Sequence, residues 1–267
     1  MHAALRALAT RLAPLRRVIV QPQVVMTSGA AAALAAVFRA PLSGALLAAE
    51  HEGELSASEA APAFVASAAG YLSFIALRGP APLLGVPATY HLVTRELLWA
   101  LPLGAACALG ATAFRRLLRF GRAALRVFPL PLRGLLAGAG LALLALPAHA
   151  LWPGLPVTQG GGLDLIAEVL KGQTPAPAAL GMLALKVLAT ALTFAGCGVG
   201  GTWLPSLAMG AALGAMFDAW AGLGQPGLFA LVGASAFTGA VHRTLLVPVV
   251  FLAETTGQAS NIAPRAA

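Results

Sequence analysis

A glycine-rich stretch, Ala195–Pro205, has the residue types needed to bind an anion through its main chain. Glycines let consecutive N–H groups turn toward a bound group with no Cβ in the way. A helix that begins near Trp203, with Pro205 in its first turn, would add free N–H groups and the positive end of its dipole. We therefore expect backbone anion binding at Gly200, Gly201, Thr202, Trp203 and Leu204.

Such a site needs no cationic side chain, whose full charge is costly inside a bilayer and would hold an anion too tightly to release it. The alternative is that these glycines only allow two helices to cross closely. Backbone anion binding requires a membrane protein with an interior pathway. The rest of the chain must therefore form such a pathway.

The composition indicates an integral membrane protein. Hydrophobic residues make up 59% of the chain and charged residues only 10%, whereas soluble domains carry about 25% charge. The net charge is +8, but the arginines lie at segment ends without interleaved aromatic residues, which argues against nucleic acid as a partner. The cluster at Arg115, Arg116, Arg119, Arg122, Arg126 and Arg133 fits the cytoplasmic end of membrane spans.

Apolar segments of uneven length predict an all-α polytopic bundle, folded as a single domain over residues 1–267 because no polar linker divides it. Several segments are too short to cross about 30 Å of hydrocarbon. Broken helices of this kind are tolerated only where protein or a water-filled cavity satisfies the backbone. The expected helices are Val24–Phe38, Leu42–Ala49, Ser56–Leu77, His91–Phe128, Leu132–Leu151, Leu163–Leu170, Ala178–Phe194, Leu204–Ala221, Leu228–Val241 and Leu245–Ala253.

An internal repeat relates two of the broken segments. Gly29–Glu50 and Gly233–Glu254 lie 204 positions apart (233 − 29) and agree at nine of 22 places. Inverted repeats with interrupted helices are typical of transporters, although abundant Ala and Leu could match by chance. The identical pairs are Gly29/Gly233, Ala30/Ala234, Ala32/Ala236, Ala36/Ala240, Val37/Val241, Arg39/Arg243, Leu42/Leu246, Ala49/Ala253 and Glu50/Glu254.

These features together resemble the chloride channel and chloride/proton antiporter (ClC) family. Residues 201–205 match the family's Gly-x-Phe-x-Pro motif with Trp203 in the Phe place, and residues 160–166 resemble its glycine-triplet turn. Gly29–Glu50 looks like the helix pair that borders the dimer interface, and Phe229–Glu254 looks like its inverted counterpart. The resemblance implies a homodimer in the lipid bilayer, one anion pathway per subunit, chloride as the transported ion, no cofactor and no enzyme activity.

Three family elements have no match: a Gly-Ser-Gly-x-Pro turn, a Gly-Lys/Arg-Glu-Gly-Pro turn with the gating glutamate, and a late tyrosine. The chain therefore looks like a middle section lacking both ends, and a truncated, non-conducting subunit is the alternative to an anion pathway. Alignment through Arg39 and Pro41 puts His51, just after Glu50, at the position of a proton-relaying glutamate. A solvated helix end is the favoured interpretation of His51, so the sequence does not support proton coupling.

The remaining polar residues leave alternatives open. Arg39 and Arg243 begin, and Glu50 and Glu254 end, the second half of each repeat, where they could line entrances or fix helix ends. Lys186 lies within a predicted span. It is either a functional group there or a residue whose amine extends to the membrane edge. Two cysteines, Cys107 and Cys197, lie in small-residue contexts typical of buried thiols. The five histidines show no metal-ligand spacing and are interpreted as isolated residues.

Overall fold

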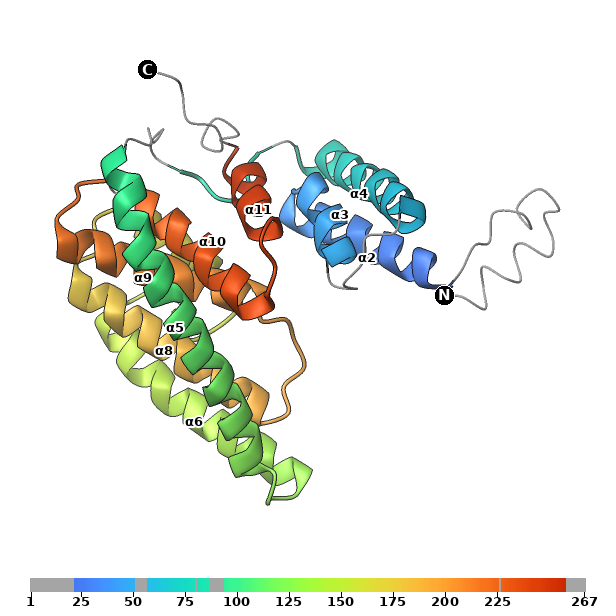
Figure 1. The fold of residues 1–267 in the computed structure, drawn as a ribbon. Helices are drawn as coiled ribbons and strands as arrows, with labels where there is room; N and C mark the ends of the chain where they lie inside the picture. The colour runs from blue at the N-terminus through green and yellow to red at the C-terminus, as the bar shows by residue number, and fades with distance from the viewer. Residues whose placement is uncertain (1–21, 51–56, 80, 87–93, 226, 258–267) are drawn as a thin grey trace. The chain divides into compact units, whose positions relative to one another are not determined.

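The computed structural model describes residues 22–50, 57–79, 81–86, 94–225 and 227–257, and within them the chain forms ten helices and no strands (Figure 1). The helices divide between two compact units, Met1–Leu83 and Leu84–Ala267. By length and composition, four helical stretches could cross a membrane: Ala60–Arg78, Thr94–Leu125, Leu130–Leu151 and Ala176–Ala195. The prediction of an all-α integral membrane fold is thus confirmed.

The first unit contains α2 (Pro22–Phe38), α3 (Pro41–Glu50) and α4 (Ala57–Arg78), which pack against one another. Glycine makes the close approach of α4 to α2 possible, because a Cβ on Gly70 would lie 2.4 Å from the carbonyl oxygen of Ala32. The predicted break after Phe38 is present, and the loop that follows Arg78 is free of helix over its described residues.

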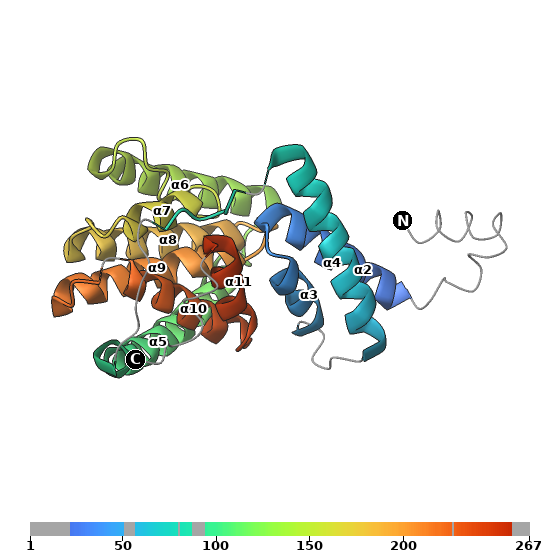
Figure 2. The ribbon, with the colours of Figure 1, turned by 90° about the horizontal axis from the view of Figure 1, so that it is seen from above.

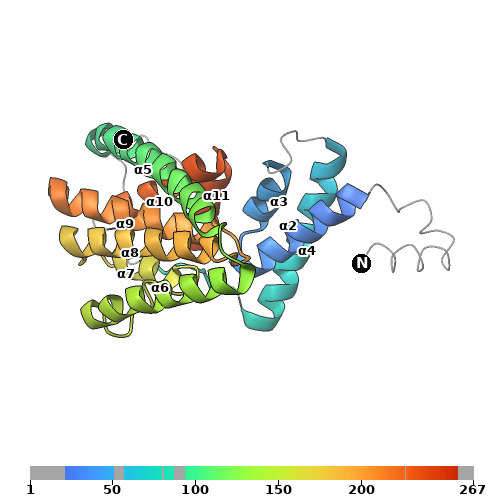
Figure 3. The same cartoon turned by 90° about the horizontal axis from the view of Figure 1, so that it is seen from below.

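The second unit contains seven of these helices, and Figures 2 and 3 show α6, α8, α9 and α10 as successive rows. The predicted bounds agree with the observed ones to within a few residues. The helices are α5 (Thr94–Leu125), α6 (Leu130–Leu151), α7 (Leu163–Leu170), α8 (Ala176–Ala195), α9 (Trp203–Ala221), α10 (Leu228–His242) and α11 (Val247–Thr256).

The two repeat segments each hold a pair of helices, and the arginine does not begin the second helix as the sequence predicted. Arg39 and Arg243 instead terminate the first helix in the left-handed conformation, with φ of 56° and 59°. In each pair the next N–H donates to a carbonyl five residues back, from Ala40 to Ala35 at 3.3 Å and from Thr244 to Gly239 at 3.2 Å. This is the Schellman arrangement, which satisfies carbonyl groups that a helix end leaves free.

Arg39 also links the end of α2 to the segment that follows α4 in the first unit. One guanidinium nitrogen of Arg39 donates to the carbonyl oxygens of Ala81 at 2.5 Å and Pro82 at 3.3 Å. The same guanidinium lies 5.2 Å from the ring centroid of Phe74, within cation–π range. Arg39 therefore has a structural role, which is one of the two alternatives that the sequence left open.

Helices α9 and α10 cross with backbone against backbone. A Cβ on Gly214 would lie 1.9 Å from the carbonyl oxygen of Phe229, and one on Gly210 would lie 2.3 Å from the carbonyl oxygen of Gly233. Gly210 and Gly214 are four residues apart, so they lie on one face of α9 as a small-xxx-small pattern. This crossing fixes the position of α9, whose first residue is Trp203.

Gly214→Ala should destabilise the protein by roughly 1–3 kcal/mol or more, because the new methyl group can be accommodated only if the helices separate. Gly138→Ala on α6 is the matched control, since nothing lies within 4 Å of its added Cβ. That control should be neutral or slightly stabilising because alanine favours helix. Thermal unfolding in detergent, followed by circular dichroism, compares the two variants; equal midpoints would contradict the crossing described here.

Candidate functional site

The glycine-rich stretch forms an exposed turn between α8 and α9. Helix α8 ends in a third Schellman arrangement, in which the N–H of Gly198 donates to the carbonyl oxygen of Thr193 at 2.9 Å. Cys197 provides the left-handed residue, with φ of 66°, and is exposed, so the expectation that both thiols are buried is correct for Cys107 and wrong for Cys197. A helix end at this point places Cys197 outside the packed part of α8.

Open space adjoins the turn just before α9. Nothing lies within 4 Å of a Cβ built on Gly200 or Gly201, and both residues are exposed. Thr202 is the N-cap of α9 but makes no side-chain capping hydrogen bond. The N–H groups of the first helical residues, Trp203 and Leu204, have no partner inside the helix, and Pro205 has no N–H. The turn therefore combines main-chain donors with room for a ligand.

The side chain of Trp203 is held against the second helix pair. It is 7% exposed, and its ring centroid lies 5.0 Å from that of His242 at the end of α10 and 5.9 Å from that of Phe251 on α11. Next to it, Thr202 Oγ1 lies 3.4 Å from His242 Nε2. Sequence reasoning missed His242, which was interpreted as isolated because 40 residues separate it from Thr202.

The glycine-triplet turn before α7 packs on the first turns of α9. A Cβ on Gly161 would lie 2.8 Å from Leu204 Cδ1, and one on Gly162 would lie 2.6 Å from Ala208 Cβ. Gly160 and Gly162 have φ of 58° and 101°, a conformation that other residues rarely adopt. Two motifs that are about 40 residues apart in the sequence therefore meet at the start of α9.

Lys186 supports this triplet turn from α8. Its side chain is 1% exposed, and Nζ donates to the carbonyl oxygens of Gln159 at 3.0 Å and Gly160 at 2.9 Å. The sequence suggested a functional group or an amine that reaches the membrane edge; in the structure the amine is buried and bonded to the triplet turn. A buried ammonium that donates to two carbonyl oxygens satisfies groups that a turn leaves without partners.

The other candidate residues are placed less fully. Glu50 is the last residue of α3, but its side chain and all of His51 lie outside the described residues. Glu254 lies in the last turn of α11, where its carbonyl oxygen accepts from the N–H of Gly257 at 3.2 Å. Within the described ranges, no group of three or more His, Cys, Asp or Glu residues is arranged to hold a metal.

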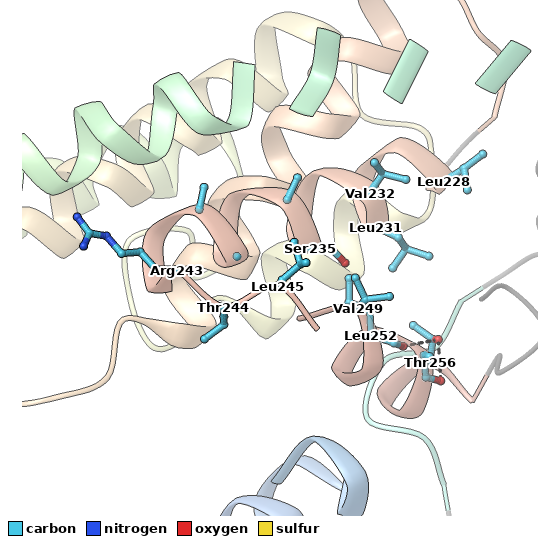
Figure 4. A pocket seen from close by; sticks show the side chains of 14 residues that line it. Leu228, Leu231, Val232, Ser235, Arg243, Thr244, Leu245, Val249, Leu252 and Thr256 are labelled. Atoms are coloured by element: carbon cyan, nitrogen blue, oxygen red, sulfur yellow. Dashed lines mark hydrogen bonds between the residues drawn. The ribbon is translucent and has the colours of Figure 1, made fainter. Parts of the chain in front are cut away.

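A separate groove of about 630 Å³ lies along α10 and α11, with Arg243 at one end (Figure 4). Its lining is largely apolar, including Leu231, Val249 and Leu252, and it includes none of residues 200–204. The groove and the glycine-rich turn are therefore different features of the second unit.

Comparison with known proteins relates this fold to chloride transport proteins. The family model described as voltage gated chloride channel matches residues 4–267. The H(+)/Cl(-) exchange transporter ClcA of Vibrio vulnificus is 26% identical, covering 90% of this chain and 53% of that protein. Chloride channel protein CLC-f of Arabidopsis thaliana is 29% identical, covering 86% of this chain and 32% of that protein. The chain thus spans about half the length of the bacterial relative.

Two crystal structures share the fold. One is a slow cyanobacterial Cl-/H+ antiporter, with a TM-score of 0.77, 20% identity and coverage of 89% of this chain and 58% of that one. The other is a CLC-type fluoride/proton antiporter, with a TM-score of 0.72, 25% identity and coverage of 90% and 60%. Fold and composition define a polytopic helical protein of the membrane, consistent with a bacterial inner membrane. The chain belongs to the voltage-gated chloride channel family.

Lys186→Met should destabilise the protein by about 1.5–3 kcal/mol, because the carbonyl oxygens of Gln159 and Gly160 lose a charged donor. Lys171→Met is the matched control, since its amine makes only an exposed ion pair with Glu168 at 2.6 Å; such pairs are worth about 0–1 kcal/mol. Thermal unfolding in detergent measures both variants. Limited proteolysis should also show faster cleavage between residues 156 and 162 in Lys186→Met, and unchanged cleavage would contradict the supporting role.

Proposed function

We propose that this chain forms part of a membrane pathway for chloride or a similar small anion, with main-chain N–H groups at residues 200–204 as one binding site. The observation that carries the proposal is the start of α9, where free amides adjoin open space at Gly200 and Gly201. Membership of a chloride channel family and the names of the exchange transporter and channel relatives support the same ion class.

The chemistry of the turn suits transport better than tight storage. Amide dipoles at a helix start attract an anion with partial charges only, so the anion can also leave. The side chains of Trp203, Thr202 and His242, which adjoin this helix start, are aromatic or polar and not permanently cationic. An anion at the turn would therefore meet a weak, fixed electrostatic attraction.

Gly201→Val tests the site without disturbing the fold, because the added side chain enters open space and the residue does not have a positive φ. In the pathway it would obstruct the amides, and we expect anion flux into liposomes to fall at least about tenfold, equivalent to a loss of roughly 1.4 kcal/mol. Gly134→Val on α6 is the control, since nothing lies within 4 Å of its Cβ either. Equal flux in the two variants would refute the assignment of the turn.

A second candidate function follows from the length of the chain relative to its relatives, 53% for the bacterial exchanger. The chain would then insert and pack as a subunit without conducting. The same liposome measurement separates the two candidates, because this one requires membrane insertion of the native chain with no anion flux above empty liposomes.

We also propose that the protein is a homodimer, as the family resemblance implies. The α10–α11 corner carries exposed apolar side chains at Leu245, Leu246 and Val249, which a second copy could cover. Light scattering of the detergent-solubilised protein should give a protein mass of about twice 26.8 kDa. A mass of one chain would contradict the dimer while leaving the pathway proposal untouched.

A further inference from the structure

One end of α5 carries an arginine stripe that the anion pathway does not use. Arg115, Arg119 and Arg122 are spaced at i, i+4 and i+7, so they lie along one face of the helix. With Arg243, from the corner between α10 and α11, they line a cavity of about 330 Å³ together with Thr112 and Leu118. Four arginines from two distant parts of the sequence therefore line one cavity.

The described carboxylates do not form ion pairs with these arginines. In the part of the chain that the structure describes, the ion pair found is Lys171 with Glu168, and none involves the cavity arginines. Residues 115–133 contain six arginines and no aspartate or glutamate. Arg115 donates to Thr112 Oγ1 at 3.5 Å, and Arg122 lies over the ring of Phe194 at 5.3 Å. The cavity is thus a positively charged site for which the described residues supply no ion-paired carboxylate.

The surroundings of the cavity have the character of a membrane interface. Helix α5 has 32 residues and is about 48 Å long, which exceeds a hydrocarbon core of about 30 Å. Its arginine-bearing end can therefore lie in the headgroup layer. Phe120 and, just beyond the helix, Val127 are 70% and 80% exposed, and Leu130 at the start of α6 is 64% exposed. Arginines and exposed apolar side chains thus occur in the same stretch of the chain, from Arg115 to Leu130.

From this arrangement we infer that the cavity of Arg115, Arg119, Arg122 and Arg243 binds the phosphate group of an anionic phospholipid of the cytoplasmic leaflet. Guanidinium forks bind phosphate oxygens bidentately, and basic pockets between membrane helices are suited to lipid headgroups. The exposed apolar side chains of the α5–α6 junction would contact the acyl chains. The inference does not depend on the anion pathway and can fail separately from it.

Lipid binding to the full chain in neutral detergent tests the inference. Native mass spectrometry counts bound phosphatidylglycerol and phosphatidylcholine during titration. The native chain should prefer phosphatidylglycerol at least about tenfold, and the triple variant R115Q/R119Q/R122Q should lose that preference, because each arginine that contacts the headgroup is worth about fivefold in affinity. The triple variant R78Q/R95Q/R116Q removes equal charge from exposed arginines outside the cavity and should retain the preference.

Several results would overturn the inference. One is a preference that survives in the cavity triple variant, and another is an equal loss in both triple variants, which would indicate net charge and no defined site. Displacement of the lipid by millimolar inorganic phosphate would identify a free-anion site instead. If the cavity triple variant does not fold, Arg119→Gln and Arg116→Gln provide the same comparison on one helix, with about fivefold against less than about twofold weakening expected.

Discussion

The bilayer's lack of hydrogen-bonding solvent is the constraint on which the rest of this structure depends. A main-chain group without a partner is costly in hydrocarbon, so interrupted helices must satisfy their ends internally. The chain does this at its helix C-termini in a consistent way. Arg39, Cys197 and Arg243 each adopt the left-handed conformation and allow a following N–H to return to the helix. Carbonyl groups at these helix C-termini therefore have hydrogen-bond partners, whereas the N–H groups at the start of α9 are left available for a ligand.

The same constraint explains the buried Lys186, for which the sequence left open a functional group or an amine that reaches the membrane edge. Lys186 Nζ donates to two carbonyl oxygens of the triplet turn, and that turn packs against Leu204 and Ala208. The charge is thus used to satisfy carbonyl groups of an irregular backbone segment. Its effect on the proposed anion site would be indirect, because it holds the turn against which the start of α9 rests.

Apolar segment length predicted the helices well, since burial in lipid and helix formation depend on the same local residues. The breaks were also predicted, because Pro41 and the glycines of the α8–α9 turn interrupt helical periodicity. What the sequence could not show are contacts between distant segments. The pairing of Trp203 with His242, and of Lys186 with the carbonyls of Gln159 and Gly160, depends on how helices cross. Likewise, a left-handed arginine or cysteine has no distinctive local signal, because glycine is the usual residue at such positions.

A binding site made of amides also requires that the amides do not move. Side chains can reorient toward an ion, but a main-chain donor is only as well placed as the helix that carries it. Helix α9 is held along its length by the glycine crossing with α10 and at its start by Trp203, Leu204 and Ser206, whose Oγ donates to the Trp203 carbonyl at 2.8 Å. Because Gly210 and Gly214 bring two backbones into contact, small changes there would be transmitted as a rigid shift of the whole helix. Gly210 and Gly214 at the crossing therefore fix the position of the N–H donors at the start of α9. Gly200 and Gly201 in the turn keep the space in front of those donors open.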